Sequence, residues 1–90
     1  MRTPYYCGQF KRDLRTAQKR GKDMDKLREL MQLLIDAAPL AARWKDHPLK
    51  GRWSHFREAH IEPDWLLIYK IDGVTVRFER NGRHADLFDQ

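Results

Sequence analysis

The stretch WLLIYKI, residues 65–71, is the most apolar run in the chain and is apolar on nearly both faces. A strand with this pattern is typical of the middle of a sheet that other elements cover on both sides. The segment just before it, KDHPLKGRWSHFREAHIEPD at residues 45–64, is polar and contains three of the four histidines. Within it, the Pro and Gly residues of 46–51 predict a loop, residues 52–61 a strand and residues 62–64 a turn. The polar segment therefore leads directly into the core strand.

A tight hairpin is predicted on the other side of the core strand. Asp72-Gly73 is a strong signal for a two-residue turn. The alternating stretch VTVRFER, residues 74–80, then returns beside the core strand with Val74, Val76 and Phe78 on its inner face.

This turn sets the pairing of the two strands. It places Ile71 opposite Val74 and, further along, Trp65 opposite Arg80, one residue from Asp64. A guanidinium on the apolar face of a strand must have a partner that compensates its charge. Arg80 either stacks on Trp65 and binds a carboxylate, or it receives a phosphate.

Asn81-Gly82 predicts a second turn, followed by a last strand at residues 83–88 (RHADLF). A two-residue loop would put the last alanine and leucine on the core face. A three-residue loop with a bulge would instead place His84 opposite Arg80. The hydrophobic pattern favours the first register. The second register is favoured by the chemistry, because it brings His84 and Arg80 together. Both leave His84 at the sheet end where Arg80 is expected.

The N-terminal half predicts two helices. Residues 2–7 can form a short edge strand, because the proline in it cannot donate to a ladder. Residues 8–20 and the leucine-rich stretch that follows have helical spacing of apolar residues, and Pro39 ends the second helix. Only a few residues join the helices, so we expect an antiparallel helical hairpin. The prediction is one α+β domain over residues 1–90, with a twisted, mostly antiparallel sheet and the helical hairpin packed across it.

Composition limits the possible classes. Ninety residues allow one core and little room for a deep pocket, so a substrate should bind on an open surface. A single cysteine, Cys7, cannot form an internal disulfide, and no apolar run approaches membrane-spanning length. We therefore expect a cytoplasmic protein.

The net charge of +5 is unevenly distributed. Residues 1–45 carry eleven Lys or Arg against five Asp or Glu, while residues 46–90 carry seven against eight. Lys11, Arg15 and Lys19 form a stripe on one face of the first predicted helix. The first half therefore suits phosphates or an acidic partner, although a merely solvated basic face gives the same pattern.

The expected topology gathers several reactive side chains at one end of the sheet: His60, Asp64, Arg80 and His84, with His47 on the neighbouring loop. Two histidines, a carboxylate and an arginine suit cleavage of RNA without a metal. One group removes the 2′-hydroxyl proton, another protonates the leaving 5′-oxygen, and a cation stabilises the phosphorane. A zinc site is the rival interpretation, but no HExxH or CxxC spacing occurs. We assign no role to His55.

The sequence resembles the RelE/ParE superfamily of bacterial toxins, most closely its YafQ branch. The resemblance covers nearly the whole chain and is carried by GQFKRDLRTAQKR (8–20), the leucine-rich second helix, KDHPLKGRW (45–53), REAHIEPDWLLIYKI (57–71) and RFERNGRHADLF (77–88). The resemblance implies a RelE/ParE-like microbial RNase fold and a ribosome-dependent endoribonuclease that cuts the mRNA codon in the A site. It implies a cognate antitoxin, the ribosome and mRNA as partners, no membrane, no cofactor and no metal, and contact with DNA only through the antitoxin complex.

The resemblance also implies a set of site residues. By motif match these are His47, His60, Asp64, Trp65, Arg80, His84 and Phe88. In this hypothesis His84 is the general acid or base, and His60 and Asp64 share the complementary proton transfer. Arg80 binds the scissile phosphate, His47 assists, and Trp65 and Phe88 hold a base or the local backbone. The cations expected to contact ribosomal RNA are Lys11, Arg15, Lys19, Lys22, Lys26 and Arg28.

Two other functions remain open at this point. A ParE-like toxin would bind gyrase and cut no RNA, but such binding has no evident need for two proton-transfer groups. A basic RNA-binding module without activity would tolerate replacement of His84 by alanine.

Overall fold

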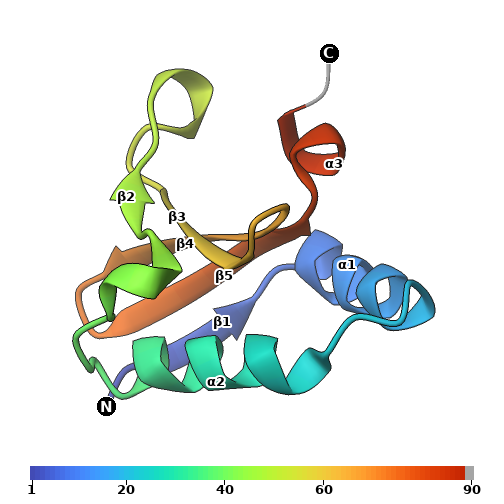
Figure 1. Ribbon diagram of the computed structural model, residues 1–90. Helices are drawn as coiled ribbons and strands as arrows, with labels where there is room; N and C mark the ends of the chain where they lie inside the picture. Colours follow the sequence, from blue (N-terminus) through green and yellow to red (C-terminus); the bar gives the residue numbers. More distant parts are fainter. Residues whose placement is uncertain (89–90) are drawn as a thin grey trace.

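The computed structural model describes residues 1–88 as a five-stranded sheet with elements on both faces (Figure 1). In chain order the elements are β1 (Thr3–Tyr6), α1 (Gly8–Lys19), α2 (Met24–Ile35), the 3₁₀ turn η1 (Ala42–Trp44), β2 (His47–Pro48), the 3₁₀ turn η2 (Gly51–Trp53), β3 (Arg57–Glu62), β4 (Trp65–Asp72), β5 (Thr75–Gly82) and α3 (His84–Phe88). The strand order is β1-β5-β4-β3-β2; β1 is parallel to β5 and the other neighbours are antiparallel. The predicted α+β class is confirmed.

Helices α1 and α2 cover one face of the sheet, which we call the α1/α2 face, as predicted (Figure 1). Gly21, with φ of +74°, follows the end of α1 in a left-handed conformation that glycine adopts without strain. The Asp23 side chain accepts the backbone N–H of Asp25 and caps α2. Helix α2 ends at Ile35, before the left-handed Ala37, so the chain leaves the helix earlier than Pro39 required.

Strand β4 lies in the middle of the sheet and is buried on both faces, as its apolar pattern predicted. Alternate residues serve two separate apolar clusters. Trp65, Leu67 and Tyr69 pack with the helices on the α1/α2 face. Leu66 and Ile68 point to the opposite face, the α3 face, where α3 and the arm that contains β2 and η2 stand (Figure 1). That second cluster includes Leu49, Trp53, Phe56, Leu87 and Phe88.

The predicted register of the β4–β5 hairpin is wrong. Ile71 pairs with Val76 and not with Val74, because Asp72 still pairs with Thr75 and the turn lies at Gly73 and Val74. Val74 is consequently 75% exposed, not on an inner face. A bulge beyond Tyr69 shifts the pairing again further along.

Two other predicted elements differ. The predicted strand at residues 52–61 begins only at Arg57, because residues 51–53 form η2. Asn81-Gly82 is not a turn but the end of β5, and residues 84–88 form α3, not a strand, so neither proposed strand register exists. Within residues 1–88 no helix has the length and apolar content needed to cross a bilayer.

Candidate active site

Three histidines converge on the α3 face from three different elements. His47 opens β2 and lies opposite Glu58 of β3, while His60 lies two residues beyond Glu58 on the same face of that strand. His84 is the first residue of α3. The ring centroids of His47 and His60 are 5.9 Å apart, and those of His60 and His84 are 6.3 Å apart. The imidazoles therefore form a continuous row, which we call the histidine row.

Sequence reasoning missed Glu58, although its spacing two residues before His60 put both side chains on one face of the strand. Glu58 is only 4% exposed. Its Oε1 lies 3.1 Å from Nε2 of His47 and 3.9 Å from Nε2 of His60. Nδ1 of His60 is buried and has no hydrogen-bond partner in the described part of the chain. The Glu58 carboxylate therefore lies within hydrogen-bond distance of the His47 ring and beside the His60 ring.

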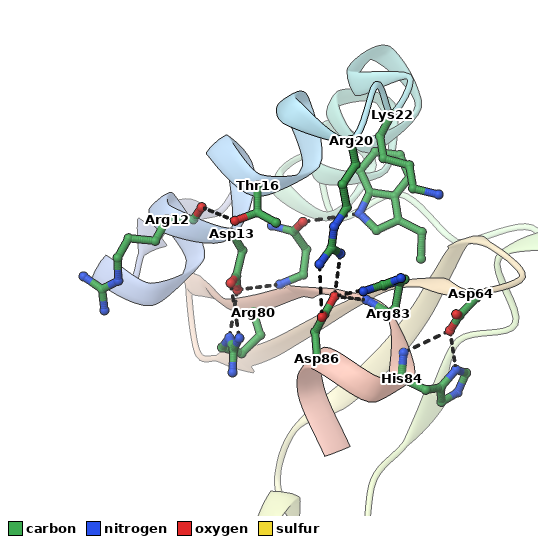
Figure 2. A network of polar contacts seen from close by, with 12 residues as sticks. Arg12, Asp13, Thr16, Arg20, Lys22, Asp64, Arg80, Arg83, His84 and Asp86 are labelled. Atoms are coloured by element: carbon green, nitrogen blue, oxygen red, sulfur yellow. Dashed lines mark hydrogen bonds and ion pairs between the residues drawn. The ribbon is translucent and has the colours of Figure 1, made fainter. Parts of the chain in front are cut away.

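Asp64 holds His84 through two contacts (Figure 2). Its Oδ1 accepts the backbone N–H of His84 at 2.9 Å and lies 2.8 Å from Nδ1 of the His84 ring. A proton on Nδ1 in this contact leaves Nε2 as the atom that can exchange a proton with a substrate. His84 is more than half exposed, so this atom is accessible.

The hydrogen bonds from the backbone N–H and the ring of His84 lower the pKa of the Asp64 carboxyl. Because the pKa of Asp64 is lowered in the folded protein, the contact of its carboxylate with His84 is fully present above the ordinary carboxyl pKa. The contact is lost only when the pH falls through the lowered pKa. Asp64 is thus ionised throughout the neutral range. The geometry suits an orienting group for His84 better than a proton-transfer group.

Helix α3 has five residues and needs outside contacts to hold its position. Asp86 supplies them: its Oδ2 accepts the backbone N–H of Arg83 at 2.9 Å, as an acid in the first turn of a helix does. Its two carboxylate oxygens also receive both terminal nitrogens of Arg20 at the end of α1, at 2.6 and 3.2 Å (Figure 2). These contacts, led by the bond from Arg20, lower the pKa of Asp86. Asp64 and Asp86 therefore fix the first turn of α3, and with it His84, from two sides.

Arg80 is not opposite Trp65, as predicted, but opposite Ile68, because of the shifted hairpin and the bulge. Its Nε and Nη2 donate to the two carboxylate oxygens of Asp13 on α1, at 2.8 and 3.2 Å (Figure 2). Asp13 also accepts the backbone N–H of Asn81. Arg80 therefore binds a carboxylate, as the first alternative expected, but it is paired with Ile68 and not with Trp65. Its Nη1 is not used by Asp13.

Trp65 does not belong to the surface site. It is 1% exposed, packs in the α1/α2-face core and donates its indole N–H to Asn81 at 3.3 Å. We therefore withdraw its predicted substrate-binding role and treat it as a core residue. The ring centroid of Phe88 lies 6.1 Å from that of His84, and its role in substrate binding stays a prediction.

The six predicted RNA-contacting cations fall into two groups. Lys22 and Lys26 both bind Glu62, and Arg28 binds Asp25. The other three are exposed on α1 and have no carboxylate partner within residues 1–88: Lys11, Arg15 and Lys19. This second group is the better candidate for an outside anion.

One set of side chains in the described residues could hold a metal ion. Ligand atoms of His47, Glu58 and His60 lie within 4.8 Å of one another. Zinc ligands in a tetrahedral site lie about 3.4 Å apart, so small side-chain movements would close this set around an ion. The donor types, two imidazoles and a carboxylate, suit zinc or copper.

Comparison with known proteins agrees with this fold and shows the family. Residues 2–89 match the model of the family described as bacterial toxin of type II toxin-antitoxin system, YafQ. The mRNA interferase toxin YafQ of Escherichia coli (strain K12) is 57% identical over 84 residues, covering 92% of this chain and 91% of that protein.

Two solved structures add what relatives bind. A crystal structure of the E. coli DinJ-YafQ complex superposes with a TM-score of 0.91 at 55% identity, covering 98% of this chain and 99% of the other. A metal-bound toxin from Helicobacter pylori gives a TM-score of 0.91 at 40% identity, covering 98% and 100%.

The family match and the identity to the E. coli toxin define the class of this chain: it is a toxin of a type II toxin-antitoxin system. This chain belongs to the YafQ family, and it is an mRNA interferase, an endoribonuclease.

Proposed function

We propose that the chain cleaves mRNA in the ribosomal A site by metal-independent acid–base catalysis and thereby stops translation and growth. The observation that carries this proposal is the histidine row with its two carboxylates, Glu58 and Asp64, on an exposed face of the sheet. Four well-formed hollows in residues 1–88 are lined by other residues, and no histidine of this row contributes to them. Because the site is an open surface, a second macromolecule must position the mRNA against it, and in this proposal the ribosome does so.

In the proposed reaction the 2′-oxygen of the ribose forms a bond to the adjacent phosphorus as the bond from phosphorus to the 5′-oxygen breaks. One imidazole takes the 2′-hydroxyl proton, and a protonated imidazole gives a proton to the leaving 5′-oxygen. His84, through Nε2, and His60, beside Glu58, form this pair. The products are a 2′,3′-cyclic phosphate and a free 5′-hydroxyl.

The remaining groups support this proton exchange. Asp64 keeps the His84 ring oriented, as a carboxylate beside a catalytic histidine does. Arg80 offers Nη1 to the phosphate while Asp13 holds the rest of the guanidinium. Leu66 of β4 pairs with His60 on one side and with Gly82 on the other. Arg80 lies two residues before Gly82, so the Arg80 backbone is about 7 Å along the strand from the histidine row. His47 assists through Glu58, and the Phe88 ring gives a base a surface on which to stack.

A cognate antitoxin is the second proposed partner, since an E. coli relative of this chain forms the DinJ-YafQ complex. Contact with DNA would then occur only through that complex. The alternative of a ParE-like gyrase poison that cuts no RNA is wrong for this chain, because the chain belongs to the YafQ family of mRNA interferases.

The test of the proposed function compares mRNA cleavage by the purified protein with and without ribosomes. Efficient cleavage only on ribosomes, with ends inside the A-site codon, is expected. Equal cleavage of naked RNA would contradict ribosome dependence.

The exposed stripe on α1 gives a prediction about affinity. Lys11→Glu/Arg15→Glu should weaken ribosome binding and flatten its dependence on salt, because each lost phosphate contact removes a counterion-release contribution. The cleavage rate on saturated ribosomes should stay near wild type, since the histidine row is untouched. Titration of ribosomes at two salt concentrations measures both effects. Arg28→Glu is the matched control, because Arg28 already has a carboxylate partner on its own helix. Unchanged affinity and slope for the double variant would remove this surface from the account.

The metal-ligand set gives a prediction about inhibition. Treating the purified protein with a chelator, which is removed before ribosomes are added, should leave cleavage unchanged. Zinc should inhibit cleavage, because an ion on His47, Glu58 and His60 occupies nitrogens that exchange protons. His47→Ala should weaken zinc inhibition at least tenfold by removing one ligand. Cleavage assays across zinc concentrations measure this effect. Loss of activity in chelator, restored by added metal, would contradict the metal-independent mechanism.

A further inference from the structure

The α3 face carries a second group of side chains that the proposed chemistry does not use. Tyr5 of β1 pairs with Arg77 of β5, and Arg77 pairs with Lys70 of β4. Arg57, the first residue of β3, pairs with Tyr69, so Phe56, just before β3, lies beside Lys70. The four residues Tyr5, Arg77, Lys70 and Phe56 thus cross the sheet in one line, which we call the transverse row. Three strand spacings make it about 14 Å wide.

Alternation along the strands places the transverse row on the α3 face. Tyr69 and Phe78 pack against the helices, so the neighbouring side chains Lys70 and Arg77 point the other way. Lys70 is four residues from Leu66 in β4, and Leu66 pairs with His60. The transverse row therefore lies about 13 Å along the sheet from the histidine row, on the same face.

The transverse row combines two cations with two aromatic rings. The Arg77 guanidinium lies 5.0 Å from the Tyr5 ring centroid, and the Lys70 ammonium lies 5.7 Å from that of Phe56. Tyr5 is nevertheless 51% exposed. Arg77 also binds Glu79, while Lys70 has no carboxylate partner in the described residues. Asp72 and Thr75 complete a hollow of about 300 Å³ around the row.

Exposed aromatic faces beside cations are the chemistry that proteins use to hold single-stranded nucleic acid, because every base has a face to stack and every nucleotide a phosphate. A carboxylate-rich partner would need only the cations, and an apolar partner only the rings. We propose that the transverse row binds a second segment of single-stranded RNA, with a base stacked on Tyr5 and a phosphate at Lys70. Asp72 repels phosphates at the turn end of the hollow and so directs the backbone toward Lys70. This proposal rests on the proposed function, because it extends the same RNA-cleaving face.

The test measures binding of a short fluorescent single-stranded RNA whose 2′-positions are methylated, so that it cannot be cut. Tyr5→Leu should lower affinity about tenfold, and Tyr5→Phe should retain it, because stacking requires the ring and not the hydroxyl. Lys70→Ala should reduce the slope of log affinity against log salt by about 0.7, the value for one phosphate of a single strand. Arg43→Ala is the matched control, since Arg43 also stacks on an aromatic ring, Trp44, but binds Glu29 of α2.

Ribosome binding then identifies the source of the RNA. Weaker binding of Tyr5→Leu only to ribosomes that carry mRNA would assign the segment to mRNA, and weaker binding to empty ribosomes as well would assign it to ribosomal RNA. The proposal would be overturned if Tyr5→Leu and Lys70→Ala kept wild-type RNA affinity, salt slope and thermal unfolding. It would also be overturned if the two variants lost only their affinity for the antitoxin. Because the methylated RNA is not cleaved, this result is independent of whether the protein cuts mRNA on the ribosome.

Discussion

Replacement of His84 by alanine should lower the rate of mRNA cleavage on saturated ribosomes by about 100- to 10,000-fold, because a positioned proton-transfer group contributes that much to catalysis. The ring is more than half exposed and its polar contact is with Asp64. Its loss should therefore leave the circular dichroism spectrum, the unfolding temperature and ribosome affinity near wild type. Single-turnover cleavage on programmed ribosomes measures the rate separately from binding.

The control for this prediction is His55, the histidine outside the histidine row. It is exposed and has a left-handed backbone with φ of +78°, so asparagine is the replacement that fits that conformation. His55→Asn should cleave at the wild-type rate. A near-normal rate for His84→Ala with an intact fold would remove His84 from the mechanism.

Arg80→Ala should lower the saturated cleavage rate by about 100-fold or more, the usual effect of removing one donor that stabilises developing charge. Arg80→Lys should recover only part of it, because lysine cannot hold Asp13 with two nitrogens and present a third to the phosphate. Single-turnover rates of both variants measure this effect.

Arg80→Ala will also destabilise the protein, because it leaves Asp13 buried without its charged partner. A double variant separates the two roles. Asp13→Asn/Arg80→Ala removes the unpaired charge and should regain much of the unfolding temperature without regaining the rate. If it restores both, then Arg80 serves only to neutralise Asp13, and its proposed contact with phosphate is wrong.

The parts of the fold that depend on local pattern could be predicted. Periodicity of apolar residues was enough to predict α1 and α2, and an apolar run was enough to predict β4 as the middle strand. The β4–β5 hairpin shows where local pattern fails. Asp72-Gly73 is a valid turn signal, but burial of Val76 and Phe78 against the helices selects a register two residues away, with Val74 in the turn.

The last segment was predicted as a strand because Asn81-Gly82 looked like a turn. Packing of Trp65 against Asn81 and the close approach of Asp86 to Gly82 determine the observed structure instead. A Cβ at residue 82 would lie 3.0 Å from Oδ2 of Asp86. Glycine is therefore needed at this position to let Asp86 approach the backbone, and not to form a turn. Asp86, three residues after Arg83, was an available signal for a helix start.

The candidate site was also predicted only in part, because local sequence pattern selects residues but does not show how the elements pack. Residue type and motif were enough to select His47, His60 and His84, and the structure places their rings side by side. They could not show that Trp65 faces the core, because that depends on which face of β4 the helices cover. They also could not reveal Asp13, which reaches Arg80 across 67 positions of sequence.

The most direct test of the central claim, 2′-hydroxyl attack driven by the histidine row, is cleavage of an mRNA that carries a single 2′-deoxy nucleotide at the scissile position. On ribosomes, the unmodified message should yield a 5′ fragment ending in a 2′,3′-cyclic phosphate and a 3′ fragment with a 5′-hydroxyl. The modified message should stay intact at that position while neighbouring codons remain susceptible. Cleavage of the 2′-deoxy message at the normal rate, leaving a 3′-hydroxyl and a 5′-phosphate, would show that water is the nucleophile and would contradict the mechanism.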